Sequence, residues 1–121
     1  MKGIGVDIVE FDRIRLIKNK EKFVDKILSE KEKKVYMTFC NEQRCLEYLA
    51  GRFALKEAIY KAAPELCKQK NFNEFSILNN EAGAPYLAEP SATGMMMTLS
   101  HSKNYVVAFV VNLLWLQKIF L

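Results

Sequence analysis

The feature that most constrains the fold is a long run of strong helix formers from Glu42 to the residue before Pro64. Apolar residues recur in it at the three- and four-residue spacing of one buried helix face. They are Leu46, Leu49, Ala50, Phe53, Ala54 and Ala58. The spacing predicts one long central helix with a buried stripe, which ends at the proline.

The same helix carries charges close to its apolar stripe. Glu57 lies one turn from Phe53 and one turn from Lys61, so an acid and a base project from one face. Such a pair is common on exposed helix surfaces, where it contributes about 0.2–0.5 kcal/mol. Taken alone, the pair is explained by that ordinary role, so any functional interpretation depends on other segments of the chain.

The first segment, residues 3–10, alternates small or acidic residues with branched apolar ones, which is typical of a half-buried strand. One face carries Ile4, Val6 and Ile8, and the other carries Gly3, Gly5, Asp7 and Val9. Two glycines leave space beside the carboxylate of Asp7. We expect either an acid in a cavity or a strand-edge charge that discourages aggregation.

Short helices are expected between this strand and the long helix. Asp12 can cap a helix from Arg13 to about Lys18, and Ser29 has the capping-box spacing for a helix through about Phe39. Helical spacing between them falls on Phe23, Val24, Ile27 and Leu28.

The second half of the chain is rich in strands. Residues 65–73 are expected to form a loop, and strands are expected at 74–78, 85–87, 95–100 and 105–111. Residues 101–104 would join the last two strands as a hairpin, and an apolar tail follows. This order predicts an α+β fold with a largely antiparallel sheet packed on one long central helix plus shorter helices. At 121 residues, the chain should form a single domain, 1–121.

The composition is that of a globular protein, with 50% hydrophobic and 26% charged residues, and the net charge is +4. Nucleic acid, an anionic membrane, a phosphorylated cofactor or an acidic protein would all suit this charge. A basic segment, residues 13–34, holds nine lysines and arginines against four acids. It is either a solvated helix surface or a docking surface for an acidic partner.

The location is expected to be cytoplasmic. The amino terminus lacks the pattern of a secretory signal, and three cysteines cannot all pair within one chain. Their spacing fits no common zinc motif, and His101 is the only histidine. The apolar end, residues 106–121, is interrupted by polar residues and is too short to span a membrane, so no membrane association is expected.

Three segments together resemble a known family. They are Gly3-Ile4-Gly5-Val6-Asp7-Ile8-Val9-Glu10 with Arg13, then Gly51-Arg52-Phe53-Ala54-Leu55-Lys56-Glu57-Ala58-Ile59-Tyr60-Lys61-Ala62, then Thr98-Leu99-Ser100-His101 followed by Tyr105-Val106-Val107-Ala108. In this order they resemble the short, single-domain class of holo-(acyl-carrier-protein) synthases, within the 4′-phosphopantetheinyl transferase family. Gly83-Ala84-Pro85 falls where that family has a Gly-x-Pro turn.

The resemblance implies transfer of 4′-phosphopantetheine from coenzyme A to a serine of apo-acyl carrier protein, in the service of fatty acid biosynthesis. It implies an Mg²⁺ ion on Asp7 and Glu57, with Lys61 on the same phosphates, and carboxylates are suitable ligands for this hard cation. Arg52 is a further candidate for contact with an anion, although helix periodicity places it on a different face from Glu57.

The resemblance also assigns Ser100 and His101 to the coenzyme A site and Arg13 to the carrier protein. The base that deprotonates the acceptor serine would be Glu57, a metal-bound water or His101. The short members of this family form homotrimers with active sites between subunits, so a homotrimer is expected. The expected partners are therefore acyl carrier protein, coenzyme A and further copies of the chain.

The chain departs from the family pattern at two places near the expected nucleotide site. Ala63-Pro64-Glu65-Leu66 replaces a glycine-containing loop, and Ala84 stands where a positive charge is expected, so Lys68, Lys70 or Lys103 could substitute. One alternative is a catalytically dead relative that still binds coenzyme A or a carrier protein. The other is a basic RNA- or DNA-binding module, but the aromatic residues mostly occupy core positions and no RNA-binding signature is present, so no nucleic acid is expected.

Overall fold

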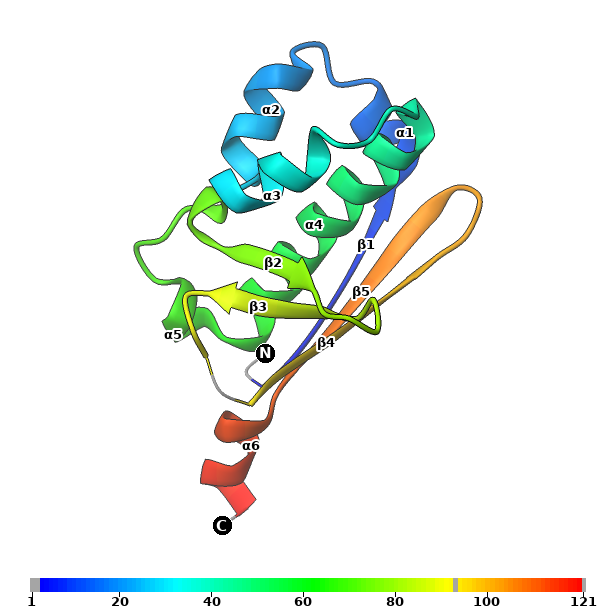
Figure 1. Ribbon diagram of the computed structural model, residues 1–121. Coiled ribbons are helices and arrows are strands. Elements are labelled where there is room, and N and C mark those ends of the chain that lie inside the picture. The colour runs from blue at the N-terminus through cyan, green and yellow to red at the C-terminus, as the bar shows by residue number, and fades with distance from the viewer. Residues whose placement is uncertain (1–2, 93, 121) are drawn as a thin grey trace.

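Helix α4 (Glu42–Ala62) runs through the middle of the molecule, as predicted, and the six residues of its apolar stripe are all buried. Its first turn is capped by Asn41, whose side-chain oxygen accepts the backbone N–H of Arg44 at 3.0 Å. The structure is a computed structural model and describes residues 3–92 and 94–120. Figure 1 shows the sheets, the short helices and α4 in one body.

The strands form two antiparallel sheets. The larger one has the order β1-β5-β4, from β1 (Ile4–Glu10), β5 (Tyr105–Asn112) and β4 (Met95–His101). The smaller one pairs β2 (Ser76–Asn79) with β3 (Pro85–Glu89), and this pair lies on the other side of α4 in Figure 1. The predicted α+β class with an antiparallel sheet on a long helix is therefore confirmed.

The two faces of β1 differ in a way that the alternation alone did not predict. The face with Gly3, Gly5 and Val9 is buried against α4, and a Cβ on Gly5 would lie 2.0 Å from the Ala58 carbonyl oxygen. The space beside Gly5 is thus taken by the backbone of α4, and the space beside Gly3 is taken by the Trp115 side chain. Gly5 brings β1 and α4 into close contact.

The opposite face of the large sheet is apolar and uncovered in the single chain. It carries exposed side chains from all three strands, and we call it the outer sheet face: Ile4, Val6, Ile8, Met96 and Phe109. The strand register places Val6 beside Phe109 and Ile4 beside Val111, so these side chains form a continuous surface.

The short helices follow the predictions with two corrections. The helices α1 (Phe11–Arg15), α2 (Lys20–Ile27) and α3 (Glu30–Tyr36) are present, and Ser29 with Glu32 forms the predicted capping box. Asp12 does not cap α1, because the helix starts one residue before it and Asp12 lies in its first turn. The predicted loop after Pro64 contains α5 (Pro64–Cys67) and the 3₁₀ turn η1 (Phe72–Glu74), since proline is well suited to the first turn of a helix.

The apolar end of the chain is more ordered than a tail. β5 is followed by α6 (Leu113–Phe120), which extends away from the body in Figure 1. Its start packs on glycines: Leu114 lies against Gly94 and Trp115 against Gly3. None of the helices within residues 3–92 and 94–120 is long and apolar enough to cross a membrane.

Candidate active site

Asp7, Glu57 and Lys61 meet where β1 crosses the last turns of α4, and we call them the carboxylate cluster. Lys61 Nζ lies 3.4 Å from Asp7 Oδ1 and donates to the Val6 carbonyl oxygen at 2.9 Å. The close approach of β1 to α4 at Gly5 brings the two residues together, although they are far apart in the sequence. The side chain of Asp7 is 19% exposed, so it lies at the edge of the core rather than free on the surface.

The electrostatics of Glu57 tie it to the same cluster. Burial raises the pKa of the Glu57 carboxyl, and the negative charge of Asp7 raises it further, while Lys61 and Arg13 act in the opposite direction. Arg13 belongs to α1, and its guanidinium carbon lies 5.4 Å from the centre of the Phe53 ring. The four predicted residues Asp7, Arg13, Glu57 and Lys61 therefore share one electrostatic environment.

The donor set of this cluster fits a hard divalent cation. Two carboxylates of like charge close to one another, one of them partly buried, are relieved by a cation between them. The described residues contain no group of three or more acid, histidine or cysteine side chains placed to hold a metal. Two protein ligands suit Mg²⁺, which commonly keeps waters and takes substrate phosphate oxygens.

Arg52 lies in a separate hollow of about 410 Å³, the Arg52 pocket. Its Nε donates to the Ile77 carbonyl oxygen at 3.1 Å, and its Nη2 donates to Asn79 Oδ1 at 3.0 Å. The guanidinium also stacks 4.5 Å from the centre of the Tyr48 ring. Arg44, Glu47 and His101 line the same hollow, so its lining includes two guanidinium groups and one carboxylate.

The structure separates the two neighbours Ser100 and His101. Successive residues of a strand point to opposite faces, so His101 lies on the α4 side with the Arg52 pocket and Ser100 lies on the side of the outer sheet face. Across the sheet His101 pairs with Val106, which pairs with Val9 of β1. His101 is thus two strand spacings, about 10 Å, from β1. Within one chain, it belongs with Arg52 rather than with Asp7.

Sequence reasoning missed the other walls of the Arg52 pocket. Arg44 and Tyr48 precede Arg52 at intervals of four residues, so all three lie on one face of α4. That four-residue spacing could have predicted a shared helix face with two arginines and a tyrosine. Asn79, by contrast, comes from β2 and is brought there only by the tertiary fold.

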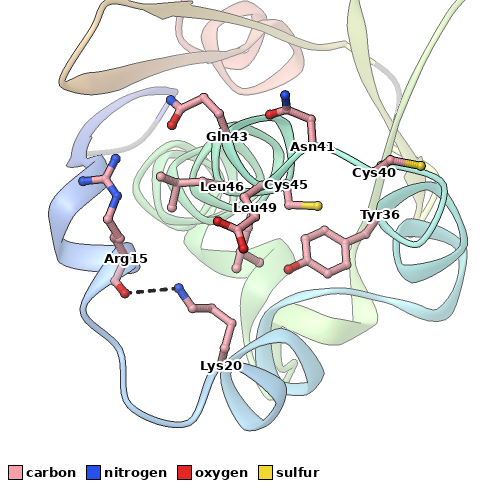
Figure 2. Close-up of a pocket in the computed structure, with 10 residues that line it drawn as sticks. Arg15, Lys20, Tyr36, Cys40, Asn41, Gln43, Cys45, Leu46 and Leu49 are labelled. Carbon is pink, nitrogen blue, oxygen red and sulfur yellow. Dashed lines mark hydrogen bonds between the residues drawn. The ribbon is translucent and has the colours of Figure 1, made fainter.

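A larger hollow, of about 930 Å³, contains none of the predicted site residues (Figure 2). Its cations already have partners: Lys20 donates to the carbonyl oxygens of Ile14 and Arg15, and Arg15 pairs with Asp12. Asn41, on its wall, is used as the cap of α4. Tyr36 and Cys45 point toward the middle of this hollow in Figure 2. Size alone therefore does not make it the reaction site.

Comparison with known proteins decides the family. Residues 3–110 match the model of the 4′-phosphopantetheinyl transferase superfamily. The chain belongs to this superfamily. Its sequence is 44% identical to the holo-[acyl-carrier-protein] synthase of Acholeplasma laidlawii, covering 90% of this chain and 93% of the relative. The corresponding enzyme of Petrotoga mobilis is 38% identical, covering 92% and 95%.

Solved structures of phosphopantetheinyl transferases agree with the fold. The holo-(acyl-carrier-protein) synthase of Bacillus anthracis, in complex with CoA (3′,5′-ADP), superposes with a TM-score of 0.75 at 37% identity and covers 90% of this chain and 93% of its own. The Helicobacter pylori enzyme in complex with coenzyme A gives 0.69 at 29% identity, covering 89% and 97%. The resemblance found in the sequence is therefore confirmed, as is the prediction of a transferase of the holo-[acyl-carrier-protein] synthase kind.

Proposed function

We propose that this chain transfers 4′-phosphopantetheine from coenzyme A to a serine of apo-acyl carrier protein, with release of adenosine 3′,5′-bisphosphate. The observation that carries the proposal is the carboxylate cluster of Asp7, Glu57 and Lys61 in a transferase whose relatives are named holo-[acyl-carrier-protein] synthases. Fatty acid biosynthesis is the process that such a holo-carrier protein serves. We place the activity in the cytoplasm, and the three free thiols, Cys40, Cys45 and Cys67, suit its reducing conditions.

The carboxylate cluster would act on the pyrophosphate of coenzyme A. Asp7 and Glu57 would hold an Mg²⁺ ion, which when bound supplies charge stabilisation for the departing phosphate. Lys61 is half-exposed beside Asp7 and can place its ammonium on the same phosphate oxygens. Glu57 is our candidate base for the acceptor serine, because it lies in the same cluster as Arg13, where the carrier protein would arrive.

The Arg52 pocket would bind the nucleotide end of coenzyme A. Arg44 and Arg52 offer guanidinium groups to phosphate, and His101 lines the same hollow. The Bacillus anthracis relative, with CoA (3′,5′-ADP) in its structure, supports a nucleotide site in this fold. We assign His101 to this contact, because it lines the same hollow as Arg44 and Arg52.

The separation of the two sites supports a homotrimer. One coenzyme A molecule has to reach both the carboxylate cluster and a nucleotide pocket, and a neighbouring subunit can supply the second of these. The outer sheet face is apolar and includes Val6, Ile8 and Phe109, each more than 40% exposed, which is the surface expected of a buried subunit interface. Ser100 lies on that side of β4, so it would reach a coenzyme A site only across the interface.

The basic segment, residues 13–34, would dock the acidic carrier protein. One of its four acids, Glu32, is fully buried and does not offset the surface charge. Arg13 lies at the edge of the carboxylate cluster, where it could hold the carrier protein with its serine near Glu57.

The proposal is tested by the intact mass of an apo-acyl carrier protein after incubation with this protein, coenzyme A and Mg²⁺. A covalent gain of about 340 Da, the mass of one phosphopantetheine group, is expected with the metal and not with a chelator. An unchanged mass with several carrier proteins, together with tight binding of coenzyme A, would instead identify a binding protein that has lost the reaction.

A further inference from the structure

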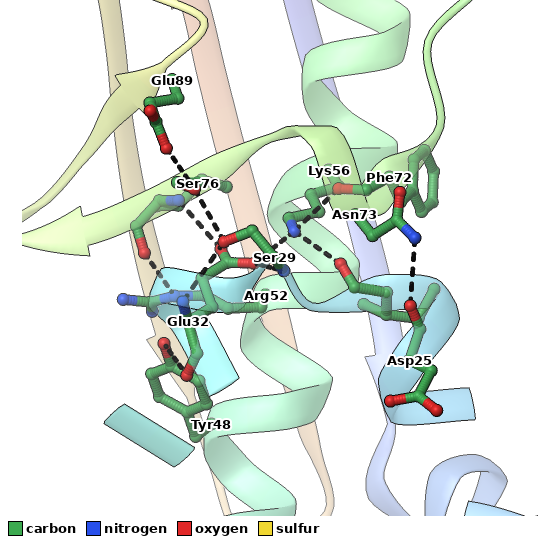
Figure 3. Close-up of polar contacts among 12 residues, drawn as sticks. Asp25, Ser29, Glu32, Tyr48, Arg52, Lys56, Phe72, Asn73, Ser76 and Glu89 are labelled. Carbon is green, nitrogen blue, oxygen red and sulfur yellow. Dashed lines mark hydrogen bonds and ion pairs between the residues drawn. The ribbon is translucent and has the colours of Figure 1, made fainter. Parts of the chain in front are cut away.

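A buried ion pair lies behind the Arg52 pocket, and none of the proposed catalytic steps uses it. Glu32 of α3 is 0% exposed and Lys56 of α4 is 1% exposed, and Lys56 Nζ lies 2.5 Å from Glu32 Oε1. Lys56 also donates to the carbonyl oxygens of Ile27 at 2.6 Å and Phe72 at 2.9 Å. Figure 3 shows these contacts at the meeting point of α3, α4 and the segment before β2.

The Glu32 carboxylate is connected to Arg52 through the backbone of a single residue of β2, Ile77. Glu32 Oε2 accepts the backbone N–H of Ile77 at 2.8 Å, and the carbonyl oxygen of the same Ile77 accepts Arg52 Nε at 3.1 Å. The position of Ile77 therefore depends on Glu32, and the direction of the guanidinium depends on Ile77. Ile77 itself is fully buried, so water does not compete for either bond.

Tyr48 provides a second connection between Glu32 and Arg52. The Tyr48 hydroxyl lies 3.5 Å from the backbone carbonyl oxygen of Glu32, toward which it donates. The Tyr48 ring supports the guanidinium of Arg52 by stacking. Arg52 is thus fixed by a hydrogen bond to β2 and by stacking on Tyr48. Glu32 contacts both β2 and Tyr48.

We infer that the buried pair of Glu32 and Lys56 is a positioning device for Arg52, which aims its guanidinium into the Arg52 pocket before any ligand arrives. A buried ion pair is a weak source of net stability, because removing both charges from water costs about as much as their attraction returns. Fixing β2 at Ile77 gives the pair a specific role. The inference rests on the proposed function only in taking the ligand of this pocket to be the nucleotide end of coenzyme A.

Two double variants separate the charge of the pair from its hydrogen bond to Ile77. Glu32→Leu with Lys56→Met removes both charges and the acceptor, and Glu32→Gln with Lys56→Met removes both charges but keeps an amide oxygen for the Ile77 N–H. We expect the first variant to bind coenzyme A about tenfold more weakly, the loss expected from one misplaced charge-assisted contact. The second should bind within about threefold of the wild type. In the first variant KM for coenzyme A should rise with the dissociation constant, and in both variants kcat should stay close to the wild-type value.

A cycle with Arg52→Ala tests whether the effect passes through Arg52. Calorimetric titration with coenzyme A should show that Glu32→Leu/Lys56→Met weakens binding when Arg52 is present and adds nothing when it is absent. Equal losses in the two backgrounds would overturn the inference and indicate general damage to the fold. Cys67→Ala, a core change in α5 outside the hydrogen-bonded network, controls for lower stability and should leave the affinity unchanged.

The outcomes also separate this inference from the proposed function. If the wild type does not bind coenzyme A, the proposed function fails. If the wild type binds it and Arg52→Ala weakens binding, but Glu32→Leu/Lys56→Met does not, only the positioning role is wrong.

A measurement on the unchanged protein covers the case in which the variants do not fold. Without ligand, hydrogen exchange followed by NMR should be much slower at Arg52 Nε–H than at the side chains of the exposed Arg13 and Arg15. Equally fast exchange at these three arginines would mean that Arg52 is not fixed in advance, which would also overturn the inference.

Discussion

At the scale of single residues, the carboxylate cluster carries the most direct prediction. Asp7→Ala or Glu57→Ala should lower turnover by about a hundredfold or more, because each removes one group that stabilises charge on the departing phosphate. Steady-state transfer to acyl carrier protein at saturating Mg²⁺ measures the effect. Glu65→Gln, an exposed acid on α5, is the matched control and should keep normal turnover. Near-normal turnover of the two alanine variants would contradict the assignment of the site.

Glu57 also links function to stability. Its pKa in the folded protein is raised, first by burial and then by Asp7, so folding favours the neutral acid. That contribution is fully present below the pKa of the unfolded chain and is lost as pH rises through the folded pKa. In metal-free buffer at neutral pH, Glu57→Gln should therefore raise Tm by on the order of 1–2 °C.

Thermal unfolding at several pH values checks this prediction. The gain should disappear below about pH 4, where the wild-type carboxyl is protonated as well. Added Mg²⁺ should raise the Tm of the wild type and have little effect on the Gln variant, since binding to the folded state stabilises it. A lower Tm for Glu57→Gln at neutral pH would show that the carboxylate is stabilised by its surroundings instead.

The residues of the site differ in how far the sequence could reveal them. Asp7, Glu57 and Lys61 stood out because they lie beside glycines or an apolar stripe, but their site roles came from the family resemblance of the segments that hold them. The pair of Glu32 and Lys56 could not, because its members lie on different helices and look like ordinary surface charges. Only the tertiary fold, which buries both, distinguishes them from the other charges of α3 and α4.

At the scale of the elements, the contact between β1 and α4 sets the geometry of the site. Gly5→Ala should destabilise the protein by roughly 1–3 kcal/mol or more, because the new Cβ would collide with the backbone of α4 at Ala58, which has no rotamer to escape. Chemical denaturation measures the loss. The variant should also lose transfer activity, since Asp7 would be pushed away from Lys61.

Gly51→Ala is the matched control within α4. Its Cβ would meet only the end of the Leu99 side chain, at 3.2 Å, and alanine is the better helix former by about 1 kcal/mol. Its stability should be unchanged or higher. A Gly5→Ala variant as stable as this control would mean that β1 and α4 do not approach as described.

The contact between β1 and α4 shows why the positions of helices and strands in the sequence were easier to predict than the packing between them. Helical spacing, the Ser29 capping box and the hairpin signals predicted most helices and strands, because these depend on neighbouring residues. The helical turn after Pro64 was missed because its sequence is polar, although proline is favourable at a helix start. The glycines of β1 indicated empty space, but the sequence does not specify which distant backbone fills it.

At the scale of the whole molecule, surface charge predicts how the carrier protein arrives. Turnover at low concentrations of acyl carrier protein should fall several-fold from low to high salt, because the basic segment attracts an acidic partner through screened charges. Arg13→Ala should raise KM for the carrier protein and leave KM for coenzyme A unchanged. Glu65→Gln, at an exposed residue outside the segment, is the control and should change neither. Turnover independent of salt would rule out this docking surface.

The outer sheet face predicts the assembly of the active enzyme. Because Ile8 is 57% exposed in an apolar surface that spans three strands, Ile8→Lys should place a charge in the proposed subunit interface and convert the proposed trimer into monomers. Light scattering should give three times the 14.0 kDa of one chain for the wild type and a single chain for the variant. Met37→Lys, at an apolar residue 79% exposed at the end of α3, should remain trimeric and active.

The monomeric Ile8→Lys variant should bind coenzyme A weakly and lose transfer, because its carboxylate cluster and the neighbouring Arg52 pocket no longer meet. A wild-type protein that is monomeric and active would show instead that one chain holds the whole site.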